Sequence, residues 1–261
     1  MPASFTAHTL RRLAASASFV LLALPFVATT AHATDLVVSA AASLTNAFKD
    51  LGAAFEQHNP GVKVINNFGA SDILMQQIVR GAPADVFASA DQTAMDKAVV
   101  EKAVQASTRK NFAANQIVLI VPSDSTLPLA TLKDLTQPAV KKVALGNPAS
   151  VPFGRYTKTA LENAGLWDAV LAKGVMAQNV RQSLDYVARG EVEAGFVFAT
   201  DAAVMPAKVK VAIRIPSDAP ATYPIAITAN TAQAELAAKY LAYVQSAAGQ
   251  AVLARYGFLK P

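Results

Sequence analysis

Two kinds of hydrophobic spacing alternate along the first part of the chain. Leu36–Val38 is a short apolar, β-branched run, which is typical of a strand. From Leu44 to Leu51, apolar residues recur at i, i+3, i+4 and i+7, the spacing of an amphipathic helix. The small residues Ala40–Ala42 make the turn between them, and Ser43 is a suitable N-cap. This stretch therefore predicts a strand that runs into a helix whose first backbone N–H groups are available to an anion.

The same arrangement recurs twice before residue 100. Val62–Asn67 alternates like a strand, a small-residue turn follows it, and Ser71 is the expected N-cap of a helix over Asp72–Arg80. Asp85–Ala88 is a third predicted strand, and a further helix is expected after Asp91. This alternation of strands and helices favours a parallel sheet with helices packed against it.

The second half of the chain restarts this pattern. Asn115–Pro122 is a long apolar strand, which we expect to cross into a second lobe, and Tyr223–Thr228 is expected to return to the first. The glycines and prolines of Gly146–Gly154 predict an irregular loop, and Asn179 is the expected N-cap of a helix that begins with Val180. The other predicted elements are a helical turn at Leu132–Leu135, strands at Val143–Leu145, Ala194–Phe198 and Val209–Ile215, and helices at Tyr156–Gly165, Gln233–Gln245 and Ala248–Tyr256.

These elements predict an α/β fold of two lobes. Each lobe is expected to hold a parallel-type sheet flanked by helices, with a ligand cleft between the lobes. The expected limits are residues 34–114 plus 229–261 for lobe I and residues 115–228 for lobe II. Lobes joined by two crossing strands close on a ligand by a hinge motion.

Residues 1–33 are predicted to be a secretory signal peptide. Arg11 and Arg12 precede an apolar core that is densest at Phe19–Val27, and Ala31–Ala33 is a small-x-small cleavage signal. Cleavage is expected after Ala33 and would place the mature protein in the periplasm, with an uncleaved anchor as the alternative. Both the Sec and the twin-arginine export routes stay open.

Composition argues against several classes of protein. The net charge is +5, and no run of Lys or Arg is longer than two, so the dense basic stripe of a nucleic-acid-binding protein is missing. The absence of cysteine excludes disulfides, thiol catalysis and a lipid-modified cysteine. After cleavage, His58 is the only histidine, which argues against Ser-His-Asp, Cys-His and the usual zinc sites.

Sequence motifs of common enzymes are also missing. We find no G-x-G-x-x-G after a strand, no phosphate-binding G-x-x-x-x-G-K-[ST], no H-E-x-x-H and no G-x-S-x-G. Asp85, Asp91, Asp185 and Asp201 could form a cation site, but they lack the spacing of a calcium loop. We interpret them as solvated or helix-capping carboxylates, and we expect no cofactor and no direct metal ligands.

What remains is a set of neutral hydrogen-bond donors at predicted helix starts. Ser43 and Ser71 each offer a hydroxyl and a following N–H, and Phe153 and Val180 offer backbone N–H groups. Such donors can hold a desolvated anion without a paired cation. A cavity of donors alone favours a fully ionised oxyanion, because a protonated one leaves its own O–H unsatisfied at a cost of about 1–3 kcal/mol.

Five segments carry a resemblance to a known family. AAASLTNAF at Ala40–Phe48 and GAPADVFASADQ at Gly81–Gln92 are together quite specific. Supporting segments are GNPASVPFG at Gly146–Gly154, NVRQSL at Asn179–Leu184 and RYGF at Arg255–Phe258. On these residues the chain resembles the periplasmic molybdate-binding proteins, the solute receptors of molybdate ABC importers. The resemblance covers essentially the whole mature chain and implies the two-lobed type II periplasmic binding protein fold.

The resemblance also implies a ligand and its contacts. It implies a binding protein, not an enzyme, with tetrahedral molybdate or tungstate held by two serines, two backbone amides and a tyrosine hydroxyl. The serines fall on Ser43 and Ser71 and the amides on Phe153 and Val180, the same four positions that the helix-start argument selects. The position of the tyrosine falls on Phe198, which has no hydroxyl.

The loss of that hydroxyl leaves two questions open. Tyr156, Thr200 or a water molecule could replace the missing donor. Alternatively, the chain could be a receptor for another small oxyanion, such as sulfate or chromate.

Other classes and the partners complete the expectations. An exported carboxylate-based hydrolase and a structural exported domain are the alternatives from other classes. As partners we expect the oxyanion and a membrane permease of an ABC importer, with the protein acting as a monomer that binds no nucleic acid.

Overall fold

The structure is a computed structural model that describes residues 1, 3–4, 33–216 and 220–261. Ala33–Pro261 form one compact unit. The predicted signal peptide falls almost entirely outside the described residues, so it stays a prediction. Among the described residues, no helix has the length and apolar character needed to cross a membrane.

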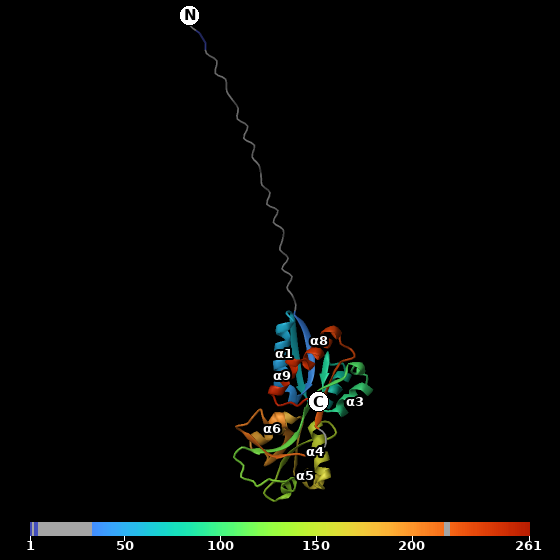
Figure 1. Ribbon diagram of the computed structural model, residues 1–261, viewed down its shortest axis with the longest axis vertical. Coiled ribbons are helices and arrows are strands. Elements are labelled where there is room, and N and C mark those ends of the chain that lie inside the picture. Colours follow the sequence, from blue (N-terminus) through green and yellow to red (C-terminus); the bar gives the residue numbers. More distant parts are fainter. Residues whose placement is uncertain (2, 5–32, 217–219) are drawn as a thin grey trace. The chain divides into compact units, whose positions relative to one another are not determined.

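In residues 33–216 and 220–261, ten strands form two five-stranded sheets (Figure 1). The first sheet has the order β2-β1-β3-β10-β4, in which β1 is parallel to β2 and β3, and β10 is antiparallel to β3 and β4. Its strands are β1 (Thr34–Ala41), β2 (Val62–Gly69), β3 (Val86–Ala88), β4 (Lys110–Asn115) and β10 (Ala221–Ile227).

The second sheet has the order β7-β6-β8-β5-β9. β6 is parallel to β7 and β8, and β5 is antiparallel to β8 and β9. Its strands are β5 (Ile117–Pro122), β6 (Val143–Gly146), β7 (Gly174–Ala177), β8 (Ala194–Phe198) and β9 (Val209–Arg214). The predicted two-lobed α/β architecture is confirmed, and each sheet also carries antiparallel strands.

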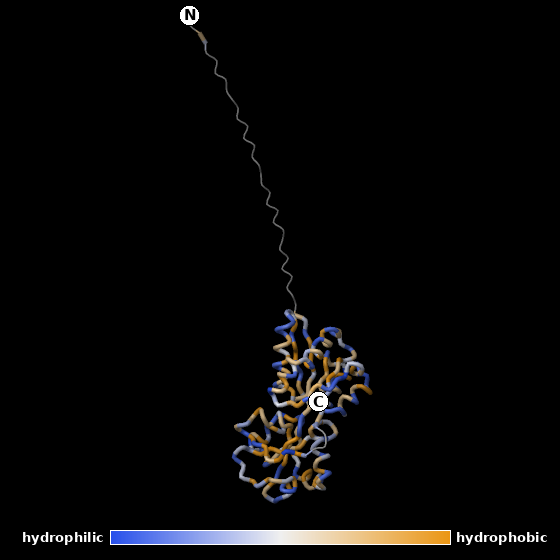
Figure 2. The backbone as a smooth tube through the Cα atoms, in the orientation of Figure 1, coloured by the Kyte–Doolittle hydropathy of each residue, from blue (hydrophilic) through white to orange (hydrophobic). Residues whose placement is uncertain are grey.

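Helices cover both sheets because each buries one apolar stripe. In α1, Phe48, Leu51 and Phe55 are buried on one side, while Lys49, Asp50 and Ala53 are exposed. Figure 2 shows hydrophobic residues along the strands and alternating hydropathy along the helices.

The helices of the first lobe are α1 (Thr45–His58), α2 (Ser71–Val79), α3 (Gln92–Val100), α8 (Ala234–Gln245) and α9 (Ala247–Arg255). Those of the second are α4 (Pro152–Asn163), α5 (Trp167–Leu171), α6 (Val180–Ala188) and α7 (Ala199–Ala202). Single 3-10 turns lie at η1 (Ala42–Leu44), η2 (Ala106–Thr108) and η3 (Leu132–Thr136).

The parallel strands set the place of the helix starts. Ala41 at the end of β1 is paired with Gly69 at the end of β2, and Gly146 at the end of β6 is paired with Ala177 at the end of β7. After each of these four strands the next regular element is a helix or a helical turn, reached from β6 through residues 147–151, so the helix starts gather at the carboxyl edge of each sheet.

The chain crosses between the sheets at Gln116. We predicted one long strand over Asn115–Pro122, but Asn115 ends β4 in the first sheet and Ile117 begins β5 in the second. The break has a local cause, because the side-chain Oδ1 of Asn115 accepts the backbone N–H of Gln116 at 2.9 Å. On the return, β10 is an interior strand of the first sheet, so the chain has crossed back before Ala221 and not at residue 228, the expected limit of lobe II.

Two predicted N-caps have other roles. Ser43 lies inside the 3-10 turn η1 and Ser71 is the first residue of α2, so neither side chain caps its helix. The Oγ of Ser71 is already engaged, because it accepts the backbone N–H of Ala90 at 3.0 Å. Asn179 is the N-cap of α6, as predicted, and accepts from the N–H groups of Arg181 and Gln182.

The predicted loop Gly146–Gly154 is shorter than expected. α4 begins at Pro152, because proline suits the first turn of a helix, where its missing N–H costs nothing. Phe153 therefore belongs to a helix start. The turn lies against the end of β6, and a Cβ on Gly154 would come within 2.4 Å of the Gly146 carbonyl oxygen.

We expect Gly154→Ala to lower the free energy of unfolding by about 1–3 kcal/mol, because backbone must move to admit the methyl group. Urea unfolding followed by circular dichroism measures the change. Gly52→Ala is the control, since its methyl would meet only the side chains of Val64 and Asn66. Equal stability of Gly154→Ala and Gly52→Ala would contradict the close approach.

Candidate functional site

One small pocket brings together all the site residues that the sequence predicts. Ser43, Ser71, Phe153, Val180 and Phe198 all line it, and the space free of atoms there is about 210 Å³. Each of these residues is at most 4% exposed. Apart from Asn179, the other lining residues are alanines, a glycine, a valine and a proline. In the part of the chain that the structure describes, no ionisable side chain lines this pocket.

Four helix starts from both sheets meet at the pocket. Ser43 and Ser71 belong to η1 and α2 beside the first sheet, and Phe153 and Val180 to the first turns of α4 and α6 beside the second. The first N–H groups of a helix have no partner within it and carry its positive partial charge. The Asn179 cap takes the N–H groups of the two residues after Val180, so that of Val180 stays outside the cap.

Both serine hydroxyls already have one protein partner. The Oγ of Ser71 accepts the N–H of Ala90, which leaves the Ser71 proton free to donate to a ligand. The Oγ of Ser43 lies 3.0 Å from the hydroxyl oxygen of Tyr223, a residue of β10. Tyr223 is fully buried and does not itself line the pocket.

Phe198 presents an aromatic ring at the place where the resemblance implies a hydroxyl. Its ring lies 6.2 Å from that of Tyr156 and 5.6 Å from that of Tyr223, both at steep angles. Neither Tyr156 nor Thr200, the expected replacements, lines the pocket. Thr200 instead accepts a hydrogen bond from the side chain of Asn115 at 2.8 Å.

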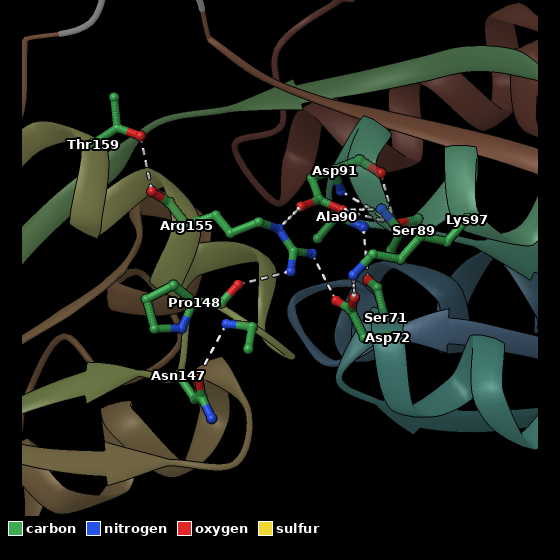
Figure 3. Close-up of polar contacts among 12 residues, drawn as sticks. Ser71, Asp72, Ser89, Ala90, Asp91, Lys97, Asn147, Pro148, Arg155 and Thr159 are labelled. Atoms are coloured by element: carbon green, nitrogen blue, oxygen red, sulfur yellow. Dashed lines mark hydrogen bonds and ion pairs between the residues drawn. The ribbon is translucent and has the colours of Figure 1, made fainter.

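Arg155 forms ion pairs from α4 to two helices of the first lobe. Its Nε donates to Asp91 Oδ2 and its Nη2 to Asp72 Oδ2, both at 2.6 Å (Figure 3). Lys97 Nζ holds the other oxygen of Asp72 at 2.8 Å. Burial lowers the pKa of Arg155, but the hydrogen bonds and charges of Asp91 and Asp72 outweigh it and raise the pKa. The two buried carboxylates are thus neutralised, and α4 is tied to α2 and α3.

Arg181 makes a comparable link from α6. Its Nη1 donates to Asn46 Oδ1 at 2.8 Å in α1, and its Nε donates to Asp201 Oδ1 at 2.5 Å. Asp201 is fully buried, and burial raises its pKa to about 6 against the lowering effect of the Arg181 charge. Around the pocket, every one of the carboxylates of Asp72, Asp91 and Asp201 therefore faces a cation.

The four aspartates considered as a cation site do not gather. Within the described part of the chain, no group of three or more His, Cys, Asp or Glu side chains could hold a metal ion. Asp91 caps α3 by accepting the N–H of Ala94, in line with the capping interpretation. Asp85 accepts the N–H of Val37 at 2.7 Å, and Asp201 is buried rather than solvated.

Arg155 and Arg181 were not predicted from the sequence as neighbours of the site. A signal was present, because each arginine stands near the start of its helix, where the dipole disfavours a cation. An arginine at such a place needs a carboxylate from elsewhere in the fold. Tyr223 and Asn115 were also missed as neighbours of the site, since they lie in strands far from Ser43 in the sequence.

The comparisons with known proteins agree over most of the chain. Residues 36–259 match the family described as bacterial extracellular solute-binding protein. The molybdate-binding protein ModA of Escherichia coli is 37% identical over 229 residues, covering 85% of this chain and 88% of its own. ModA of Mycobacterium tuberculosis H37Rv is 36% identical over 234 residues, covering 89% and 87%. The structure of the Azotobacter vinelandii periplasmic molybdate-binding protein has the same fold, with a TM-score of 0.76 and 24% identity, covering 87% of this chain and 99% of its own.

We expect Arg155→Met to lower the free energy of unfolding by about 3 kcal/mol, because it leaves buried carboxylates with fewer partners. Urea unfolding measures the loss. Arg109→Met is a matched control, since the partner of Arg109, Asp96, has a side chain 62% exposed, and such pairs contribute less than about 1 kcal/mol. A loss no larger for Arg155→Met than for Arg109→Met would show that the ion pairs do not stabilise the fold.

Asp201 gives a prediction for pH. Because its pKa is raised in the folded protein to about 6 from 3.8, its contribution to stability is present below about pH 4 and is lost as the pH rises through about 6. The stability of the wild type relative to Asp201→Asn should therefore fall by up to about 3 kcal/mol over this range. Urea unfolding of both proteins at several pH values tests this, and a constant difference would refute it.

Proposed function

The chain belongs to the bacterial extracellular solute-binding proteins, and from that premise we propose that it captures molybdate or tungstate in the pocket described above. Membership of this family confirms the expectation of a binding protein and not an enzyme. We further propose that it acts as a monomer in the periplasm and delivers the oxyanion to the membrane permease of an ABC importer.

The observation that carries the proposal is a buried pocket lined by neutral donors and by no ionisable side chain. An anion there gains its stabilisation from hydrogen bonds, each worth roughly 1.5–3 kcal/mol when one partner is charged. A fully ionised tetrahedral oxyanion offers acceptors alone and so matches such a lining. The ModA relatives are named for binding molybdate, which supports the same ligand here.

In this proposal each predicted site residue has a stated role. Ser43 and Ser71 donate from their hydroxyls, and Phe153 and Val180 from their backbone amides. Phe198 closes the pocket with an apolar ring and donates no hydrogen bond. No cofactor takes part, because molybdate or tungstate is the cargo.

Calorimetric titration tests the ligand. We expect the purified, dialysed protein to bind one molybdate or one tungstate tightly, with sulfate and phosphate giving no heat. Preferential binding of sulfate or chromate would replace molybdate by another small oxyanion while keeping the receptor role. Silence toward every oxyanion would overturn the proposal.

Serine variants test the site. Ser43→Ala and Ser71→Ala should each weaken molybdate binding by about 1–3 kcal/mol, since each removes a donor to a charged ligand. Ser183→Ala is the control, because Ser183 is buried and donates to the Phe196 carbonyl at 2.8 Å away from the pocket lining. Calorimetry on all three variants measures the molybdate affinity. If Ser43→Ala and Ser71→Ala both bind molybdate as tightly as the wild type does, the site lies elsewhere.

A further inference from the structure

The orientation of the Asn115 side chain is fixed by its neighbours. Its Oδ1 receives the backbone N–H of Gln116 at 2.9 Å, and only an oxygen can accept that proton. Its Nδ2 must therefore point the other way, where it donates to Thr200 Oγ1 at 2.8 Å and to the Tyr223 hydroxyl at 3.3 Å. The Tyr223 oxygen thus accepts a hydrogen bond from Asn115.

The Tyr223 ring is held on several sides. It packs against Phe198 and Phe258 at 5.6 Å and against Phe112 at 6.3 Å between ring centroids. Burial raises the pKa of its phenol well above the ordinary value, and the Asp201 charge acts in the same direction, so the hydroxyl keeps its proton. Since its oxygen already accepts from Asn115, that proton is available to Ser43 Oγ, 3.0 Å away.

These contacts restrict the direction in which the Ser43 hydroxyl proton can point. If Ser43 Oγ accepts from Tyr223, its own proton must point elsewhere, and Ser43 lines the pocket. Ser71 is in the equivalent situation, because its Oγ accepts the N–H of Ala90 and its proton is likewise free. Both pocket serines would then have a proton free for a ligand and one lone pair already engaged by the protein.

We propose that Tyr223 is a positioning residue, which passes the donor direction set by Asn115 to Ser43 and so directs the Ser43 hydroxyl proton toward the bound oxyanion. The inference rests on the proposed function and deepens it. It assigns discrimination against protonated oxyanions to a particular contact, because Ser43, with one lone pair taken by Tyr223 and its proton turned to the ligand, is poorly placed to accept the O–H of hydrogen phosphate. Tyr223 acts in place of a hydroxyl at Phe198, through Ser43 and without touching the ligand.

The test is calorimetry on Tyr223→Phe, with Tyr240→Phe as the matched control. Tyr240 is also fully buried among aromatic rings, and its hydroxyl oxygen has no hydrogen-bond partner among the described residues. Molybdate is titrated directly, and hydrogen phosphate is titrated against bound molybdate at mildly alkaline pH. In Tyr223→Phe the Ser43 hydroxyl becomes free to rotate, so we expect molybdate affinity to fall about ten-fold. Phosphate should compete better relative to molybdate than in the wild type, and Tyr240→Phe should change neither.

Asn115→Asp gives a second test that keeps the side-chain shape. Asp can accept from both Gln116 and Tyr223 but cannot donate to Tyr223, so the relay would run in the opposite direction. Ser43 would then donate to Tyr223 and turn a lone pair toward the pocket. The added charge opposes both dianions, molybdate and hydrogen phosphate, so the selectivity ratio is the informative readout, and it should again shift toward phosphate.

Two results with the variants would overturn the role of Tyr223. Unchanged affinity in Tyr223→Phe would show that Tyr223 does not orient Ser43. Equal weakening of molybdate and phosphate in both variants would show a packing role alone. If the wild type binds sulfate in place of molybdate, only the ligand of the proposed function fails, and the same variants are compared with sulfate. If calorimetry detects no binding of any oxyanion by the wild type, both proposals are overturned.

Discussion

Backbone N–H groups at a helix start must find an acceptor, and in this protein four such starts are turned toward one buried point. The parallel strands β1, β2, β6 and β7 end in register and pass directly into helices or turns, so the constraint arises from the sheets themselves. Small residues at the turns allow the starts to approach closely, and Gly154 lies directly against Gly146. The pocket is therefore a by-product of strand register as much as of its lining side chains.

The charged side chains around the pocket are paired with one another, so they do not disturb the hydrogen-bond donors that line it. The carboxylates of Asp72 and Asp91 would repel an anion, but Arg155 holds both and Lys97 holds one. Asp201 is similarly held by Arg181. On the proposed function, with the carboxylates neutralised and no cation among the lining residues that the structure describes, selectivity would depend on the direction of hydrogen-bond donors and not on net charge. This is the setting in which the proton position of one serine, Ser43, becomes important.

The sequence was informative wherever the relevant interaction was local. The alternation of strands and helices predicted both lobes, and the cap at Asn179 was found because it depends on residues adjacent in the chain. Ser71 was mistaken for a cap, since its hydroxyl is engaged by Ala90, which no local pattern reveals. Gln116 was predicted to lie inside a strand, because the hydropathy pattern cannot reveal a single side-chain hydrogen bond. The contact of Ser43 with Tyr223 joins residues 180 positions apart and is decided only by how β10 inserts into the first sheet.

The placement of the two arginines ties recognition to mechanics. Phe153 and Arg155 share one turn of α4, and Val180 and Arg181 are consecutive in α6. A helix moves as a rigid rod over such short distances, so the amide that faces the pocket and the guanidinium that holds the opposite lobe cannot be displaced independently. Any force that pulls the lobes apart must break both arginine links and withdraw both amides in the same stroke. On the proposed function, opening of the lobes would by itself withdraw these donors from the bound oxyanion.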